Sequence, residues 1–452
     1  MGCLRGPASP SRPSVKPLLI AASLLASHAA VAQVAPPAQD PTPSLEERLR
    51  RLEERLATQD AELQKLRQPS PAAADTKPKT SHWYDRLSIR GYGQIRYTSL
   101  LGENNTPDLN VPNDRSVNEP ESLILRRGRV ILFGDVAEHL YIYAQLDFAG
   151  STGAADQALQ MRDFYGDISL DAAKEYRFRV GTSKVPFGWV NLQSSQNRGP
   201  IERPDALNSA AEGERDLGAY FMWAPREIRD RFRDLVRSGR KGSGDYGVLA
   251  VGAFTGQGLN RSDTNGEVHT LARASWPFEL PNHQVFEVGV QAYTGRFRPN
   301  TQAISGTTPA VNPRGVRDER VGVTAVWYPQ PFGLEAEWNW GVGPQSSSDN
   351  TRITDEYLQG GYVQASWLQN GAGGAWFPFA RWNYFDGSRK FARNAPSHNV
   401  NELDLGLEWS PWPEVEITVQ YTHTFWRTDT TTAPYREARG DDRVGFQVQV
   451  NF

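Results

Sequence analysis

The chain ends with Val444-Gly445-Phe446-Gln447-Val448-Gln449-Val450-Asn451-Phe452. Apolar and polar residues alternate through this stretch without interruption, and a period of two residues is typical of a β-strand. One face of such a strand is apolar and ends on an aromatic residue, while the other face is polar. This pattern favours the closing strand of a barrel that meets lipid outside and water inside. The alternative is an edge strand of a soluble β-sandwich.

The composition of the chain fits one large barrel or two to three soluble domains. The chain has 452 residues, of which 22% are charged, with 40 glycines and 13 tryptophans. Its mean hydropathy is −0.57. After residue 32 no run of about 18 apolar residues occurs, so we expect no membrane-spanning helix. Many glycines and aromatic residues with a low mean hydropathy suit an all-β barrel with a polar lumen and an apolar outer face.

Residues 1–32 have the pattern of a secretory signal peptide. A basic region precedes the apolar stretch Leu18 to Ala26, and Ala30-Val31-Ala32 forms a small-residue cleavage site. A membrane anchor is the alternative, but the apolar stretch is too short for one. Cleavage would remove three basic residues and no acid, which changes the formal charge from −3 to −6. It would also remove Cys3, the single cysteine.

The segment between the signal and the strands is predicted to hold one helix between two linkers. Residues 33–43 and 69–84 are the linkers, rich in proline and alanine at 33–43 and again from 69 to 79. Residues 44–68 are the helix, which begins with the capping box of Ser44 and Glu47. Its leucines follow a 4-3-4-3 spacing, which predicts a periplasmic coiled coil, with a single amphipathic helix as the alternative.

Residues 85–452 are predicted to form a sixteen-stranded antiparallel transmembrane β-barrel, because each strand is close to the ~9–11 residues that cross a bilayer. The expected strands are 86–98, 122–134, 138–149, 160–170, 175–183, 214–224, 245–254, 266–277, 284–294, 318–328, 332–341, 357–368, 374–385, 400–409, 414–426 and 442–452. Short turns and long polar connections alternate, as periplasmic turns and extracellular loops do.

One connection on the short-turn side breaks this alternation. Residues 225–244 are far longer than the other turns, and Arg226 to Leu235 within them have the pattern of a small basic amphipathic helix. The sequence offers no functional account of this insertion.

The alternation also predicts which side chains face the lumen. The inward candidates are Arg90, Arg96, Arg129, Arg177, Arg179 and Lys184. Arg126 and Arg127 are adjacent and cannot both face inward in a regular strand, so we expect a bulge or kink at Gly128. The alternative for any one arginine is a side chain that reaches to the membrane interface.

Four segments resemble, in order, the phosphate-selective porin O and P family. They are Leu125-Arg126-Arg127-Gly128-Arg129, Leu146-Asp147-Phe148, Gly181-Thr182-Ser183-Lys184-Val185-Pro186-Phe187-Gly188 and Ile201-Glu202-Arg203-Pro204. The resemblance covers roughly residues 85–452 and implies a homotrimer of sixteen-stranded barrels, with the third long loop folded into the lumen.

The resemblance also implies the binding residues. Arg126 and Arg127 match the paired arginines of the family, Arg203 the arginine at the end of the folded loop, and Asp163 an inward acid. Guanidinium groups suit oxyanions. The chain departs from the family at Asn191 and Gln196, where phosphate-selective members carry loop lysines, so a weaker anion preference is expected. The resemblance to other outer-membrane barrels implies that Phe452 is the terminal aromatic residue recognised during barrel assembly.

The sequence therefore predicts a porin in the bacterial outer membrane, in contact with its lipid, with the N-terminal segment in the periplasm. Its solutes would be small anions, phosphate or similar, or other small hydrophilic molecules. The alternative is a structural protein that tethers the envelope through residues 44–68. No spacing for a metal site or a catalytic nucleophile is present, nor a nucleic-acid-binding tract. We therefore expect no enzyme activity, no cofactor, no metal and no nucleic-acid partner.

Overall fold

The computed structural model describes Arg50, Glu54 and residues 82–101, 121–152, 155–304, 306–429 and 436–452. The chain divides into residues 1–80 and residues 81–452. In the first unit, Arg50 and Glu54 form an i,i+4 ion pair of 3.8 Å on a helix. The predicted signal 1–32, linker 33–43, helix 44–68 apart from these two residues, and the part of linker 69–84 up to residue 81 lie outside the described residues.

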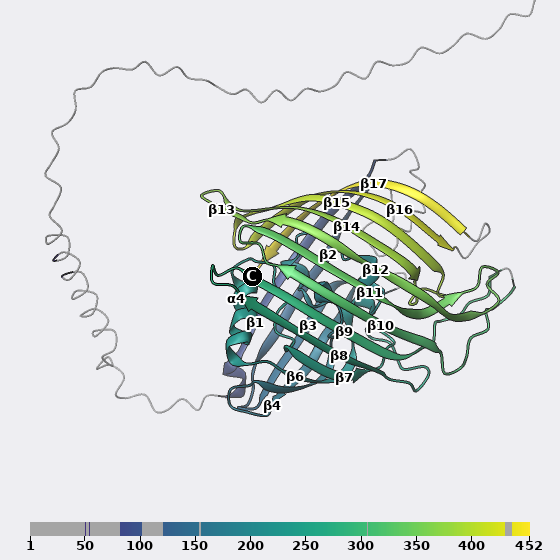
Figure 1. The fold of residues 1–452 in the computed structure, drawn as a ribbon, viewed down its shortest axis with the longest axis horizontal. Coiled ribbons are helices and arrows are strands. Elements are labelled where there is room, and N and C mark those ends of the chain that lie inside the picture. The colour runs from purple at the N-terminus through teal and green to yellow at the C-terminus, as the bar shows by residue number, and fades with distance from the viewer. Residues whose placement is uncertain are drawn as a thin grey trace, which may run out of the picture. The chain divides into compact units, whose positions relative to one another are not determined.

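The second unit is a closed antiparallel barrel (Figure 1). Its strands are β1 (Leu87–Leu100), β2 (Glu121–Asp135), β3 (Leu140–Thr152), β4 (Ala155–Ser169), β5 (Tyr176–Lys184), β6 (Arg215–Trp223), β7 (Leu249–Phe254), β8 (His269–Glu279), β9 (Val285–Phe297), β10 (Val316–Trp327), β11 (Phe332–Ser346), β12 (Ile353–Trp367), β13 (Gln369–Gly371), β14 (Gly374–Ser388), β15 (Ser397–Trp412), β16 (Val415–Asp429) and β17 (Arg436–Asn451).

The predicted number of sixteen barrel strands is confirmed. Each strand pairs with its neighbours in the chain, and β1 pairs with both β2 and β17, which closes the sheet. The short β13 continues β12 beyond Leu368, and both pair with β14, so together they form one barrel strand. At the seam, Gly91 N donates to Phe452 O at 2.8 Å and Phe452 N donates to Gly91 O at 3.0 Å. The seam is therefore paired up to the last residue.

Most predicted strand boundaries differ from the structure by a few residues, and two of them are instructive. The expected loop 150–159 is mostly strand, because β3 continues to Thr152 and β4 already begins at Ala155. The expected strand 245–254 begins only at Leu249, because Asp245 turns inward to pair with Arg177 at 2.7 Å. Both differences lie at strand ends, where alternation is a weak signal.

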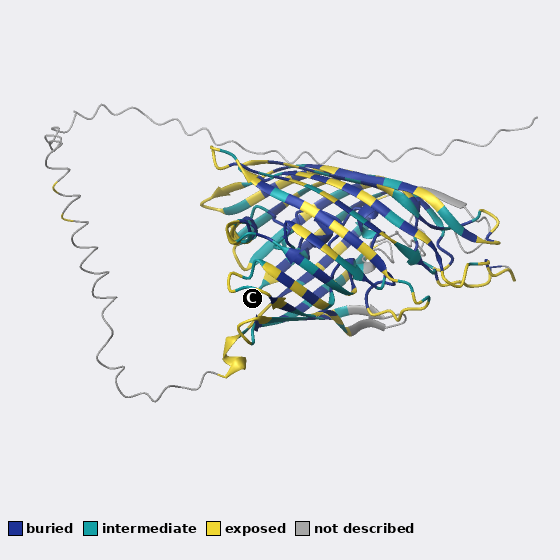
Figure 2. Ribbon diagram, turned by 60° about the horizontal axis from the view of Figure 1, so that its bottom comes forward, coloured by how far each residue is buried: buried dark blue, intermediate teal, exposed yellow. Residues whose placement is uncertain are grey.

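Burial alternates along the strands, as Figure 2 shows in its chequered pattern. On β16 the outward Val419 and Phe425 are exposed, while the inward Thr418 and Gln420 are buried. This is the arrangement that a lipid-facing outer surface and a polar interior require. Trp376 and Trp409 stack outside the barrel near the short turns, with ring centroids 5.2 Å apart. Among the described residues, no helix is long and apolar enough to cross a membrane.

The predicted paired arginines both face the lumen, but the bulge that allows this was placed wrongly. The β1–β2 register passes from Gln94 opposite Arg127 to Ile95 opposite Leu125, which leaves Arg126 as the extra residue. The bulge therefore lies at Arg126 and not at Gly128. The β3–β4 register makes the same jump, from Gln145 opposite Asp163 to Leu146 opposite Met161.

Two segments fill the interior of the barrel. The first is the loop between β5 and β6, which holds α2 (Trp189–Leu192), η3 (Ser195–Asn197), α3 (Asp205–Asn208) and η4 (Glu212–Glu214). It is the predicted third long connection, and α3 contacts the inner side of β12 and β14. The second segment contains α4 (Arg226–Arg237), which confirms the amphipathic helix predicted in the insertion. A single turn of 3-10 helix, η2 (Trp83–Arg86), precedes β1.

Candidate functional site

The charges that point into the barrel are segregated between two walls. We define the basic wall as the inner side of β1–β6, which carries Arg90, Arg96, Arg126, Arg127, Arg129, Arg162, Arg177, Arg179, Lys184 and Arg215 with the acids Asp147, Asp163, Asp167 and Asp216. We define the acidic wall as the inner side of β9–β16, which carries Glu287, Asp318, Glu335, Glu337, Glu402, Asp404, Glu408 and Glu416 with the bases Arg320 and Arg381. The inward placement of all six predicted lumen residues agrees with this arrangement.

The inserted loop lies against the acidic wall. The main-chain N–H groups of Trp189 and Val190 donate to Glu337 at 2.7 and 3.2 Å. The indole of Trp189 donates to Glu287 at 3.3 Å. Arg320 donates to the carbonyl of Ala206 at 2.9 Å. Glu287 and Glu337 thus serve to hold the loop, and both are no more than 3% exposed.

The basic wall keeps contact with water at a few residues, while most of its bases are buried. Arg90 is exposed, and Tyr141, Tyr143 and Tyr165 beside it are half-buried. Tyr143 stacks on Tyr165 with ring centroids 5.1 Å apart, and the Arg179 guanidinium lies 3.9 Å from the Tyr165 ring. Arg90 and these tyrosine rings thus keep contact with water on this wall, whereas Arg179 is buried.

Arg126 and Arg127 meet Arg96 around one carboxylate of the inserted loop, Glu202. The shortest N–O separations from Glu202 are 2.6 Å to Arg96, 2.8 Å to Arg126 and 3.7 Å to Arg127. Burial acts to raise the pKa of Glu202, but the charges of Arg126, Arg96 and Arg127 outweigh it and hold the pKa well below its usual value. Three cations facing one anion leave this cluster with a positive charge. Arg126 and Glu202 retain 15% and 16% side-chain exposure.

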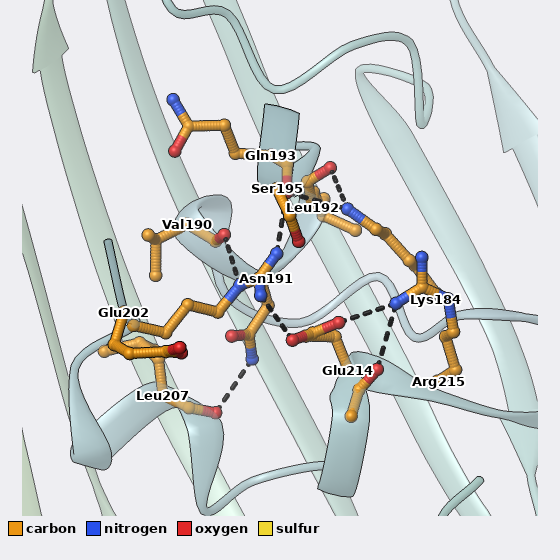
Figure 3. A network of polar contacts seen from close by, with 12 residues as sticks. Lys184, Val190, Asn191, Leu192, Gln193, Ser195, Glu202, Leu207, Glu214 and Arg215 are labelled. Carbon is orange, nitrogen blue, oxygen red and sulfur yellow. Dashed lines mark hydrogen bonds and ion pairs between the residues drawn. The ribbon is translucent and has the colours of Figure 1, made fainter. Parts of the chain in front are cut away.

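The other two predicted binding residues, Arg203 and Asp163, belong to a second cluster, around Glu214. Arg203 is ion-paired with Glu214 and donates to the carbonyl of Gln193 at 2.9 Å. Arg215 links Glu214 at 2.6 Å to Asp163 at 2.8 Å. Figure 3 shows Glu214 and Arg215 beside Lys184, which donates to the carbonyls of Leu192 and Gln193, both at 2.8 Å. Arg203, Asp163 and Lys184 thus position the loop, and Arg203 makes no direct contact with Arg126 or Arg127 among the described residues.

The remaining inward arginines have acids or aromatic rings beside them. Arg129 binds Asp147 at 2.9 Å, and Arg179 binds Asp167 at 2.7 Å. Arg177 binds Asp245 at 2.7 Å. The Arg90 guanidinium lies 5.1 Å from the centre of the Phe133 ring.

The two positions where the family carries loop lysines differ in their surroundings. Asn191 is 1% exposed and donates from its side chain to the carbonyl of Leu207 at 2.8 Å, so it stabilises the loop (Figure 3). Gln196 is half-buried, and its main-chain carbonyl accepts a hydrogen bond from Gln449 at 3.1 Å.

Arg198 is a loop residue that the sequence did not single out. It is 5% exposed, and its Nε and Nη1 atoms are buried without a hydrogen-bond partner among the described residues. It lies on the inserted loop between η3 and Glu202. A buried guanidinium with unused donors calls for water or an anion. A lone arginine in a polar loop is a common pattern, so the sequence gives no reason to single out Arg198.

A closed barrel of antiparallel strands with an apolar outer face, a charged lumen and an inserted loop defines a porin-type protein of the outer membrane. The sequence matches the family described as "Phosphate-selective porin O and P" over residues 103–452. The chain belongs to this family and is an outer-membrane channel protein.

Solved structures with a similar fold include three bacterial proteins. The outer membrane channel DcaP of Acinetobacter baumannii has 13% identity and a TM-score of 0.47, with 81% of this chain and 97% of that chain covered. OmpT of Vibrio cholerae has 10% identity and a TM-score of 0.48, with the same coverage. The anion-selective porin from Comamonas acidovorans has 10% identity and a TM-score of 0.45, with 81% and 99% covered. The comparison with curated proteins gives no match.

Proposed function

We propose that the chain forms a passive channel that prefers small anions. In this proposal it works as a homotrimer in the outer membrane, with residues 33–80 in the periplasm. Its solutes are small hydrophilic molecules that carry negative charge, such as phosphate or a small carboxylate. The supporting observation is the excess of positive charge on the basic wall where it keeps contact with water. Arg90 is exposed there, and the partly exposed Arg126 shares the single carboxylate Glu202 with two further arginines.

The physical reason is the low dielectric constant of the barrel wall. Field lines from a few charges concentrate in a narrow aqueous passage, so local charge counts for more than the charge of the whole protein. The cluster of Arg96, Arg126 and Arg127 around Glu202 keeps an excess of positive charge. It would therefore attract anions although the formal charge of the chain is −3.

Arg198 supports oxyanions as the preferred class of anion. Guanidinium groups present a planar fork of donors that matches carboxylate and phosphate oxygens. The unused Nε and Nη1 donors of Arg198 belong to the same inserted loop as Glu202. Asn191 and Gln196 contribute no charge, so we propose a preference among anions that is weaker than a lysine-bearing loop would give.

The test is the reversal potential of the full-length protein in planar lipid bilayers under a roughly tenfold salt gradient. Stepwise currents with a reversal potential on the anion side are expected. Cation selectivity would refute the proposed preference. A barrel that never conducts would favour the tethering role, which depends on residues 44–68.

The assembly role of Phe452 also stays a prediction. Its ring lies over Gly91, where a side chain would come within 2.4 Å of the ring carbon Cζ. Phe452 is 68% exposed, which leaves it accessible to an assembly factor. Deletion of Phe452 should lower the amount of folded, heat-modifiable protein in the outer membrane.

A further inference from the structure

The connection between β6 and β7 is unlike every other described connection at the same end of the barrel. Elsewhere this end has turns of a few residues, but here residues 224–248 intervene. Ile228, Phe232 and Leu235 of α4 are at most 2% exposed. They belong to one apolar cluster with the inward side chains Met222 and Tyr328. The helix is therefore packed inside the mouth of the barrel, at the end that also carries β13 (Figure 1).

Polar contacts fix α4 to two separate points of the rim. On one side Arg226 N donates to Glu175 at 2.9 Å, and Arg229 donates to the carbonyl of Lys174 at 2.5 Å, both in the β4–β5 turn. On the other side Arg231 donates to the carbonyl of Pro277 at 2.9 Å and pairs with Glu279 at 2.8 Å, both at the end of β8. The helix thus bridges part of the opening.

The chain after α4 continues into the lumen and meets the inserted loop. The Lys241 ammonium group is buried in an ion pair with Glu408 on β15. The main-chain carbonyl of Lys241 accepts a hydrogen bond of 2.6 Å from Gln193, and that of Gly242 accepts one of 2.6 Å from Asn197. Gln193 and Asn197 belong to the inserted loop, which enters from the opposite end. The two inward segments are therefore joined inside the barrel.

The returning part of the segment borders the basic wall. Asp245 pairs with Arg177 at 2.7 Å and with Arg229 at 2.9 Å, and the Arg179 guanidinium lies 5.4 Å from the Tyr246 ring. The segment is thus anchored to β5 and to β15, on both walls of the lumen.

We propose that residues 225–248 form a second constriction, at the short-turn end, that sets the size limit of the channel. Anchored to β5 and to β15, they narrow the lumen at this end together with the inserted loop. The pair Lys241–Glu408 and the apolar face of α4 hold the constriction in place. This inference concerns the size of the solute and applies to a channel of either ion preference, so it goes beyond the proposed function.

Two variants test the constriction in the full-length protein. Lys241→Met/Glu408→Leu removes the ion pair without leaving a buried charge unpaired. Phe232→Asp places a charge on the buried face of α4, which should drive the helix out of the mouth. The measurements are single-channel conductance and the swelling of proteoliposomes in neutral sugars of increasing size, arabinose, glucose and sucrose. Arg233→Gln, on the exposed side of α4, is the matched control.

Either constriction variant should raise the conductance by about twofold or more and admit sugars that the unaltered channel excludes. The control should leave both properties unchanged. Heat modifiability shows whether each variant is folded, and the two variants disturb different contacts, so one misfolded variant leaves the other as the test. Folded variants with the conductance and sugar limit of the unaltered protein would overturn the proposal. A changed sugar limit with unchanged ion preference would separate this constriction from the arginine clusters.

Discussion

The basic wall and the acidic wall arise from the same alternation of inward and outward residues, but they differ in which of their charges the inserted loop covers. On the acidic wall, Glu337 accepts main-chain N–H groups of Trp189 and Val190 at 2.7 and 3.2 Å. On the basic wall, Arg90 stays exposed and Arg126 stays partly exposed, while the other eight bases are buried. The difference teaches that the charge of a wall does not decide the field in a channel. What decides it is which charges remain in contact with water after the loop has folded in.

The largest effect is expected from the double substitution Arg126→Gln/Arg127→Gln. It removes two cations of the cluster around Glu202 and should lower the anion-to-cation permeability ratio by about threefold or more, with a larger change at low salt because screening is weaker. Reversal potentials in salt gradients provide the measurement. An unchanged reversal potential with persisting conductance would show that these arginines do not line the passage.

Glu335→Gln is the matched control for this comparison. Glu335 lies on the acidic wall, is 3% exposed and accepts no hydrogen bond from the loop among the described residues. Because it is covered, its charge should have little effect on the reversal potential. A clear shift of the reversal potential towards anion selectivity in this variant would mean that the acidic wall contributes to the electric field in the lumen.

The second prediction uses Glu337→Ala, which should loosen the loop. The substitution leaves the N–H groups of Trp189 and Val190 without their acceptor, at a cost of about 1–3 kcal/mol of stability. Exposure of the acidic wall should then raise the conductance and lower the anion preference, although a negative charge has been removed. If Glu337 acted directly through its charge, its removal would instead raise the anion preference. One reversal-potential measurement therefore separates the two roles.

The third prediction concerns the loop positions without lysine. Gln196→Lys should strengthen the anion preference by roughly twofold and introduce a block of chloride current by phosphate, because it adds a cation at a half-buried site. Asn191→Lys should instead destabilise the loop, since Asn191 is 1% exposed and binds the carbonyl of Leu207. Equal behaviour of the two variants would contradict this distinction.

The smallest effect is expected from mild acid. The arginines around Glu202 hold its pKa well below the usual value, against the effect of burial. Glu202 should therefore stay ionised between about pH 7 and about pH 5, and the stability it contributes should be lost only at lower pH. The reversal potentials of the unaltered protein and of Glu202→Gln should differ by a constant offset over this range. A gap that closes towards pH 5 would show that Glu202 takes up a proton there.

The barrel was predictable from the sequence because alternation is a local property. Val444 to Phe452 and the other strands carry the pattern in consecutive residues, and a closed sheet follows from many such strands. The inward direction of Arg177 and Arg179 followed in the same way. Arg126 and Arg127 stand out through the resemblance to the family. They also stand out because two adjacent residues of a regular strand cannot both face the lumen.

The partners of these residues were not predictable, because they depend on how the loop folds against distant strands. Glu202 lies 106 residues from Arg96 in the chain, and Trp189 lies 148 residues from Glu337. No local pattern encodes such contacts. For the same reason the resemblance predicts Arg203 as a binding residue together with Arg126 and Arg127, whereas in the fold Arg203 is ion-paired with Glu214. Arg198 was missed because only burial distinguishes it from other loop arginines.

The bulge at Arg126 has a consequence at the level of the gene. A bulge is one extra residue in one strand, so it corresponds to one inserted codon. That codon adds an inward charge beside Arg127 while the number of strands and the circumference of the barrel stay the same. The register shift at Arg162 likewise adds one residue to β4, and this residue places a base beside the acid Asp163. Single in-frame insertions at chosen heights are therefore a route by which the charge of such a lumen can be altered, by mutation or by protein engineering, without redesign of the barrel.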